Sequence, residues 1–284
     1  MDDVKPNLVL QAVIEAGVAK ANLRGGQMLV RGILGGAILA CATTLAFAAT
    51  AQTGIPMAGA ILFPAGFVII LLLGLELVTG SFAMLPLAKL KKQISARQMS
   101  AAIAWAIAGH LIGCVAYAAL YGLTVTKMGT DVGGPLVQAL VQASEAKTIA
   151  YRQMGADGLL LVTVKAVLCN WMVTLGAVVS FKSTSTLGKI SAMWLPVLLF
   201  FGQGFEHAVV NLFVIPAGMM LGADVSFADW WLWNQLPVLV GNFIGGAVFT
   251  GLFFYWSHRA ADPRPRSAFA DAREGIGAKL EQFG

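Results

Sequence analysis

Residues 200–218 (FFGQGFEHAVVNLFVIPAG) constrain the fold more than any other stretch, because they are apolar and yet carry polar groups in the middle. A helix that crosses a bilayer needs about 20 apolar residues. Here Glu206, His207 and Asn211 interrupt such a span, with glycines just before them and a proline after. Ionisable side chains at membrane depth are costly, so they mark sites of function. The stretch therefore predicts a broken membrane helix that contains a functional site.

The composition is that of a polytopic membrane protein. Of the 284 residues, 58% are hydrophobic and only 12% charged, with a mean hydropathy of +0.77, whereas soluble domains carry about 25% charged residues. The net charge of +5 forms no single basic block, so the chain does not resemble a nucleic-acid-binding protein. Cys41, Cys114 and Cys169 all lie in apolar spans, and we expect three reduced, buried thiols without disulfides.

Apolar stretches predict an all-α protein with six membrane spans. The expected spans are residues 28–50, 56–87, 100–122, 157–181, 190–221 and 234–257. Span 56–87 is interrupted at LELVTGS, which makes it a second broken helix beside the one in span 190–221. Before the spans, residues 1–26 predict an amphipathic cytoplasmic helix that lies on the membrane or on a neighbouring subunit. Residues 27–258 are the expected transmembrane domain, residues 126–156 a polar, partly helical loop, and residues 259–284 a cytoplasmic tail.

The charges of the loops predict the orientation in the membrane. Lysine and arginine gather in loops 89–97 and 182–189 and in the C-terminal tail, whereas loops 51–55 and 222–233 have none. By the positive-inside rule both termini are cytoplasmic, which agrees with an even number of spans. We therefore expect a multi-pass protein of the cytoplasmic (inner) membrane.

The two broken spans belong to an internal repeat. The segment GLELVTGSF around Glu76 matches GFEHAVVNLF around Glu206, 130 positions later, and GHLIGCV from Gly109 matches GNFIGGAV from Gly241, 132 positions later. Each copy holds three spans, so the copies must be inverted in the membrane. Interruptions at corresponding positions of inverted halves point to a binding site near the membrane midplane.

The breaks are expected to form an anion site, because helix N-termini carry partial positive charge and free N–H groups. His207 can supply a hydrogen bond or a proton near neutral pH, unless it is a core histidine held by Asn170 or by a backbone carbonyl. Thr79 offers a hydroxyl at the other break. Asn170 is expected to hold either His207 or the anion. Lys165 is either a pore cation or a side chain that snorkels to the membrane surface or packs against a neighbouring subunit.

The remaining polar and aromatic residues have expected structural roles. Glu76 and Glu206 are expected to bond free N–H groups of the opposite break, with Asn211 as further support. Phe63, Phe67 and Phe200 lie at helical spacings that allow an apolar ring around a passage. A bare ion would cross such a ring only at great cost, whereas a neutral acid would cross far more easily.

At these residues the sequence resembles the formate/nitrite transporter family. The matching segments are E-A-G-V-A-K-A from Glu15, L-V-T-G-S from Leu77, L-C-N-W-M-V from Leu168, G-F-E-H-A-V-V-N-L-F-V-I-P-A-G from Gly204 and G-N-F-I-G-G from Gly241. The resemblance implies an aquaporin-like protomer of six helices with helices 2 and 5 broken, assembled as a homopentamer with one pore per protomer.

The resemblance also implies roles for single residues. It makes His207 the central histidine, Thr79 the threonine of the first break and Asn170 the pore asparagine. It places Phe63 and Phe200 at one constriction, and Phe67 and Val78 near the cytoplasmic one. The lysine that the family carries near helix 4 has no clean counterpart; Lys147 has a similar local context but lies far from Asn170 along the chain, while Arg152 and Met154 lie nearer.

The expected function is a channel or transporter for small monovalent anions of weak acids, with formate first and proton coupling through His207. Alternatives are a nitrite or hydrosulfide channel and, in another class, an aquaporin-like pore for neutral solutes, against which the missing Asn-Pro-Ala pair argues. The sequence has no metal-ligand cluster, phosphate loop or nucleophile–base spacing, so we expect neither an enzyme nor a cofactor. The expected partners are small anions, protons, lipid and further copies of the chain, and no nucleic acid.

Overall fold

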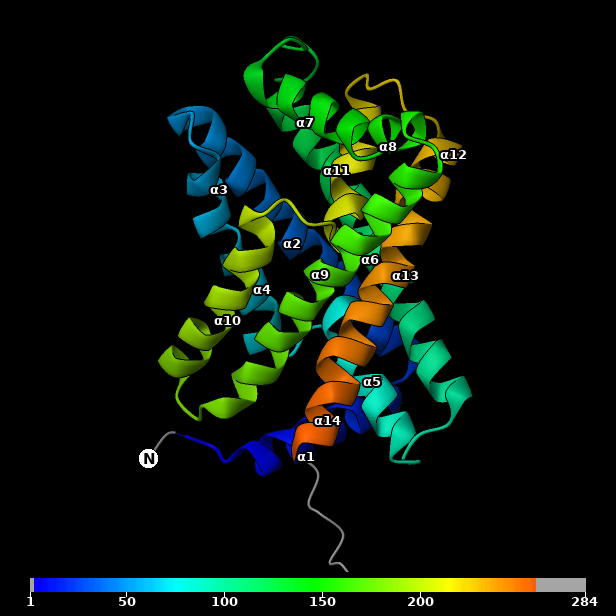
Figure 1. Ribbon diagram of the computed structural model, residues 1–284. Helices are drawn as coiled ribbons and strands as arrows, with labels where there is room; N and C mark the ends of the chain where they lie inside the picture. Colours follow the sequence, from blue (N-terminus) through cyan, green and yellow to red (C-terminus); the bar gives the residue numbers. More distant parts are fainter. Residues whose placement is uncertain (1–2, 259–284) are drawn as a thin grey trace, which may run out of the picture.

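The computed structural model describes residues 3–258 and contains the six expected spans (Figure 1). Four helical runs are long and apolar enough to cross a bilayer: α2 (Gly25–Thr53), α6 (Ala96–Val125), α9 with the following 3-10 turn (Ala156–Lys182), and the run from α12 to α14 (Phe227–His258). The other two spans are divided. One consists of α3 (Pro56–Leu62), α4 (Pro64–Leu72) and α5 (Val78–Leu90), and the other of α10 (Thr186–Gly202) and α11 (Ala208–Met220). The expected six-helix fold with breaks in helices 2 and 5 is confirmed.

The two breaks have the same backbone geometry. Gly74 and Gly204 lie 130 positions apart, and both have a left-handed φ, 63° and 65°, a region that glycine enters without steric cost. The next residue in each break, Leu75 or Phe205, donates a backbone hydrogen bond to the residue five positions before it, at 3.0 Å and 3.2 Å respectively. The helix before each break therefore ends in the same turn.

The first broken span has an additional kink that the sequence analysis did not include. Phe63 lies between α3 and α4 and is followed by Pro64 at the first position of α4. Proline has no N–H to donate and its ring crowds the preceding turn, so the helix is divided there. The kink sets Phe63 at the junction of two short helices.

The interhelical packing repeats in the two halves. An added Cβ at Gly109 of α6 would lie 2.9 Å from the Cα of Gly32, and one at Gly241 of α13 (Leu236–Ile244) would lie 2.7 Å from the Cβ of Ala166. The small residues on α6 and α13 thus let each helix approach α2 or α9 closely, as is usual in membrane bundles. Figure 1 shows α5 at the end of the molecule where α1 lies, and α11 at the other end beside α7, so the broken spans run in opposite directions.

The N-terminal helix α1 (Pro6–Ala21) packs on α5 of its own chain. At Gly17 an added Cβ would collide with the carbonyl oxygen of Met84. In the other half, α7 (Pro135–Ala146) packs on α11, and Ser144 donates to the carbonyl of Ile215 at 3.1 Å. The region expected as a polar loop thus holds α7 and α8 (Ile149–Gln153).

Large apolar side chains remain exposed along the outer faces of the spans, as expected where the surroundings are lipid or other copies of the chain. Examples are Leu120, Leu160, Leu195, Leu232 and Val240. Cys114 and Cys169 are buried free thiols as predicted, but Cys41 is exposed, because it lies on the outward side of α2. The expected C-terminal tail, residues 259–284, lies outside the described residues.

Candidate functional site

The two helix breaks meet at a hydrogen bond between His207 and Thr79. The His207 Nε2 lies 3.0 Å from the Thr79 Oγ1, although the residues are 128 positions apart. His207 is the N-cap of α11, and its Nδ1 accepts the backbone N–H of Val210 at 3.2 Å. Because Nδ1 is an acceptor, the ring proton of the neutral imidazole lies on Nε2, which donates to Thr79. The Thr79 hydroxyl hydrogen is then free to point towards a solute.

A second side chain caps the helix that begins at each break. At the first break, His110 Nε2 accepts the N–H of Val78 at 3.0 Å, and its Nδ1 donates to the Gly32 carbonyl at 2.8 Å. At the second break, Asn242 Oδ1 accepts the N–H of Ala208 at 2.9 Å. Asn242 also donates to the carbonyl of Ala166 at 2.8 Å. His110 and Asn242 occupy equivalent positions in the repeated G-x-x-I-G segments, so both are structural braces.

Each break also contains a buried glutamate that is neutralised by a lysine of its own half. Glu76 Oε2 lies 2.6 Å from Lys20 Nζ, and Ser81 donates to Oε1 at 2.5 Å. Glu206 Oε2 lies 2.8 Å from Lys147 Nζ. The expectation that each glutamate bonds N–H groups of the opposite break is wrong, since a buried carboxylate needs a cationic partner more than a further amide.

Glu206 has three further donors. Tyr151 donates to Oε1 at 2.9 Å, Asn211 to Oε2 at 2.8 Å and Asn234 to Oε2 at 3.5 Å. Asn211 therefore supports the second break as expected. The ion pair also shows where Lys147 lies, the residue whose match to the family's lysine near helix 4 was open from spacing alone. It lies beside Glu206 and not beside Asn170.

Sequence reasoning missed Lys20, although a signal was present. The segment A-G-V-A-K that ends at Lys20 corresponds to A-S-E-A-K that ends at Lys147, 127 positions later. The two segments occupy equivalent places on α1 and α7. The repeat thus extends to the N-terminal helix, which was expected to stand apart from it.

Asn170 joins the first break to the helix after the second. Its Nδ2 donates to the carbonyl of Thr79 at 3.0 Å and to the carbonyl of Asn242 at 2.6 Å. It makes no hydrogen bond to His207, so the first of the two expected roles is wrong, and contact with the anion stays a prediction. Its Oδ1 is buried without a partner among the described residues. Asn170 therefore fixes the backbone beside Thr79.

A layer of aromatic rings covers His207. Phe200 stacks on the imidazole with a centroid distance of 5.6 Å and an interplanar angle of 17°. Phe63 meets the Phe200 ring edge to face at 5.8 Å. Phe201, which the sequence analysis did not name, stacks on Phe63 at 3.8 Å. Phe63 and Phe200 are each 1% exposed, so the layer is closed in this structure.

Two cavities lie on either side of this closed layer. The first, of about 260 Å³, is lined by Lys20, Arg31 and Lys189 together with Gly74 and Leu75 of the first break, and no acidic residue lines it. The second, of about 290 Å³, lies at the second break. Its lining residues are uncharged: Ala46, Phe47, Thr50, Pro56, Ala60, Phe201, Gly202 and Gly204.

One side of α3 and α4 lies between the two cavities and borders each of them at one end. Ala60 lines the second cavity and Leu71 the first. Phe63 and Phe67 lie between them, each one turn further along, and both are 1% exposed. Eleven residues of helix span about 16 Å. The apolar barrier between the cavities is therefore thin compared with a bilayer core of about 30 Å.

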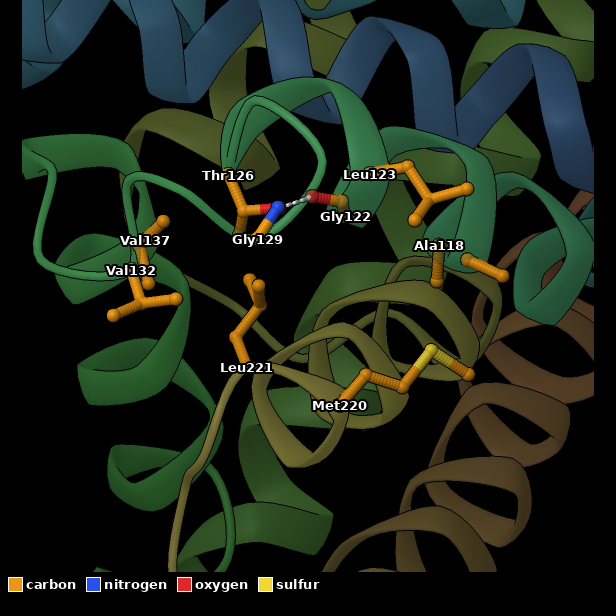
Figure 2. Close-up of a pocket in the computed structure, with 10 residues that line it drawn as sticks. Ala118, Gly122, Leu123, Thr126, Gly129, Val132, Val137, Met220 and Leu221 are labelled. Atoms are coloured by element: carbon orange, nitrogen blue, oxygen red, sulfur yellow. Dashed lines mark hydrogen bonds between the residues drawn. The ribbon is translucent and has the colours of Figure 1, made fainter.

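A third cavity, of about 320 Å³, lies where α6, α7 and α11 meet (Figure 2). Its lining is mostly apolar. The hydroxyl group of Thr126 lines the cavity, but it donates to the carbonyl of Gly122, another lining residue, at 2.7 Å. None of its lining residues is charged. Within residues 3–258 no cluster of three metal-binding side chains occurs either.

The comparisons with known proteins agree with this architecture. A model of the formate/nitrite transporter family matches residues 7–256. The uncharacterized transporter YrhG of Bacillus subtilis is 35% identical over 271 residues, covering 91% of this chain and 95% of the relative. A probable formate transporter of Methanothermobacter thermautotrophicus is 30% identical, covering 82% of this chain and 89% of the relative.

A solved structure described as a pentameric formate channel with formate bound has the same fold. It superimposes with a TM-score of 0.67 at 22% identity, covering 83% of this chain and 98% of the solved one. The family match spans both helix breaks and the two cavities beside the aromatic layer, and the relatives are transporters and channels. The chain therefore belongs to the formate/nitrite transporter family and has the fold of its membrane channels.

Proposed function

We propose that this protein passes formate and related small monovalent anions of weak acids across the membrane, with proton coupling at His207. The observation that carries the proposal is the 3.0 Å contact between His207 and Thr79, which joins both helix breaks beside the aromatic layer. Support for formate comes from the relatives, among them a probable formate transporter and a channel solved with formate bound.

The electrostatics of the site favour an anion up to the aromatic layer and oppose it inside the layer. Helices α5 and α11 both begin at the breaks, and their N-termini carry partial positive charge. The rings of Phe63, Phe67 and Phe200 offer no hydrogen bond to a charged solute. Transfer of an unpaired carboxylate into such surroundings is very costly, so the solute crosses as the neutral acid.

The tautomer of His207 indicates how the proton is provided. Nδ1 is occupied by the N–H of Val210, so the neutral ring presents only the Nε2 proton, to Thr79. A neutral imidazole does not readily give up its last proton. We therefore infer that His207 polarises the Thr79 hydroxyl, and that a proton from the bulk solvent reaches the anion through a water held by this pair, which is left unchanged. The acid ionises again in the cavity beyond.

The wider arrangement follows from the loop charges and the relatives. We propose a homopentamer in the cytoplasmic membrane with both termini in the cytoplasm, residues 27–258 acting as the channel domain. The pentameric state of the solved relative supports the assembly. In this orientation the cavity lined by Lys20, Arg31 and Lys189 opens towards the cytoplasm.

The test is solute flux into liposomes that contain the purified protein, with formate, nitrite, hydrosulfide and glycerol compared at two pH values. His207→Phe is expected to abolish anion flux. His207→Asn keeps an acceptor for the α11 cap but removes the ring, and it should also lose anion flux while remaining folded. His258→Phe, at a histidine outside the site, is the matched control and should behave as wild type.

The pattern of solutes decides between the alternatives. A larger nitrite or hydrosulfide flux than formate flux would reassign the solute within the same class. Glycerol flux without anion flux would identify a neutral-solute pore. Wild-type formate flux in a folded His207→Asn variant would refute the role of His207.

A further inference from the structure

Phe201 lies at the boundary between the aromatic layer and the cavity at the second break. Its side chain lines this cavity, and its ring also stacks on Phe63 of the layer. Phe63 and Phe200 are each 1% exposed, whereas Phe201 is only partly buried. A solute that enters from this cavity therefore meets the Phe201 ring before it reaches the closed pair of Phe63 and Phe200.

The three rings form a close group. The Phe63 and Phe201 rings are nearly parallel, with a centroid distance of 3.8 Å and an interplanar angle of 14°. The Phe200 ring is steeply inclined to both, and its centroid lies 5.8 Å from that of Phe63 and 6.2 Å from that of Phe201. Because these two distances are similar, Phe200 lies beside the stacked pair and not on the free face of Phe63. Parallel rings at 3.8 Å are already in van der Waals contact, so the Phe63 ring has no room to move towards Phe201.

The backbone on both sides of Phe63 is held against α2. An added Cβ at Gly59 of α3 would collide with the carbonyl oxygen of Ala46, and one at Gly66 of α4 would lie 2.5 Å from the Cβ of Ala42. Such close approach leaves the two short helices no space to shift on α2. The part of Phe63 that can move is therefore its side chain.

The end of α10 is held by the turn of the second break. The carbonyl of Phe200 accepts the N–H of Phe205 at 3.2 Å, and the carbonyl of Phe201 accepts the N–H of Gly204 at 3.0 Å. Both phenylalanines thus have their backbones tied to the turn. The layer opens by rotation of its rings, and the width of the gap depends on the space that each ring finds beside it.

We infer that Phe201 limits the size of the acid that passes the aromatic layer, and that it restricts the path to acids of about the size of formate. The inference rests on the proposed function, because it names the solute class of the same path. Phe201 occupies the space into which the Phe63 ring would otherwise turn. An acid with a methyl group on the carboxyl carbon, such as acetate, needs a wider gap than formate. Apolar sites distinguish solutes that differ by one such group about 10–200-fold.

The experiment measures initial rates of formate and acetate entry into liposomes that contain the full chain, after subtraction of the rates in protein-free liposomes. The acetate-to-formate ratio is compared between variants at one pH, so that the different acidities of the two acids cancel. Phe201→Ala should raise this ratio at least about tenfold and keep the formate rate within about threefold of wild type. Phe201→Leu keeps part of the side-chain volume and should give an intermediate ratio.

Phe47→Ala is the matched control. Phe47 lines the same cavity, whereas the ring contacts of Phe63 in the described part of the chain are with Phe200 and Phe201. The control enlarges the cavity as Phe201→Ala does but leaves the three rings in contact, so its acetate-to-formate ratio should equal that of wild type. Chloride entry is measured in parallel. Chloride is not protonated at the pH of the assay, so it should stay excluded in all variants.

Several results would overturn the inference. One is an unchanged ratio in Phe201→Ala, or in Phe201→Leu if the alanine variant does not fold. An equal rise in Phe47→Ala would place the size limit in the cavity and not at the rings. Chloride entry together with acetate would show that Phe201 seals the layer against ions and does not select by size. A wild-type protein that carries no formate would refute the proposed function itself, whereas formate transport with an unchanged ratio in the variants refutes the role of Phe201 alone.

Discussion

Replacing Lys20 or Lys147 by methionine is expected to destabilise the protein strongly, because each lysine neutralises a carboxylate that water barely reaches. The side chains of Glu76 and Glu206 are 2% and 3% exposed. Removing one partner of a buried ion pair costs about 3–5 kcal/mol, since the other charge stays behind uncompensated. Methionine keeps most of the aliphatic stem, so the change isolates the charge.

The two substitutions should differ in size, because the glutamates differ in their remaining donors. Without Lys147, Glu206 keeps Tyr151, Asn211 and Asn234, with distances of 2.9, 2.8 and 3.5 Å. Without Lys20, Glu76 keeps only the Ser81 hydroxyl. We expect a loss of about 3 kcal/mol for Lys147→Met and about 5 kcal/mol for Lys20→Met. At about 2–4 °C per kcal/mol, these correspond to Tm decreases of about 6–12 °C and 10–20 °C.

The assay is thermal unfolding of the purified protein in detergent, followed by the loss of helical signal. Glu76→Gln in the Lys20→Met background should restore much of the lost stability, because it removes the stranded charge. Glu206→Gln should do the same for Lys147→Met. The reasoning is refuted if Lys147→Met is the more damaging change, or if glutamine restores nothing in either background.

Two further predictions concern the meeting of the breaks and the packing of the repeat. Thr79→Val keeps the shape of the side chain but removes the hydroxyl, and it should lower formate flux at least about tenfold, which corresponds to about 1.4 kcal/mol. Thr79→Ser keeps the hydroxyl and should retain most of the flux. Equal flux in both variants would contradict the role of the hydroxyl. Gly241→Ala should cost about 2 kcal/mol, because the new Cβ would lie 2.6 Å from the Thr163 carbonyl oxygen. Gly26→Ala, where an added Cβ meets nothing within 4 Å, should cost nothing in the same unfolding assay.

The spans and the two breaks could be predicted from the sequence because they depend on local physics. Apolar length sets the spans, and the polar groups around Glu76 and Glu206 interrupt them. The repeated segments around Gly109 and Gly241 fixed the register of the halves. The meeting of Thr79 with His207 was suggested by the same repeat, although the 3.0 Å contact itself depends on how the halves pack.

The partners of the polar side chains could not be predicted in the same way. Glu206 is held by Lys147 and Tyr151, which lie more than fifty positions before it, directly after α7 and in α8 respectively. Those helices contain too many polar residues to be recognised as part of a membrane bundle. The kink at Phe63 followed from Pro64, whose effect inside an apolar span was underestimated. The role of His110 as a helix cap required knowledge of which N–H group it faces.

The hydrogen bonds of the two buried histidines have a consequence for inhibition by metals. Zinc and copper ions bind a neutral imidazole through its free lone pair. In His207 that lone pair accepts the N–H of Val210, and in His110 it accepts the N–H of Val78. Each remaining ring nitrogen carries a hydrogen. A metal ion that reached the narrow part of the path could bind either imidazole only by breaking the hydrogen bond that caps the start of α11 or α5. Trace zinc or copper should therefore not inhibit transport.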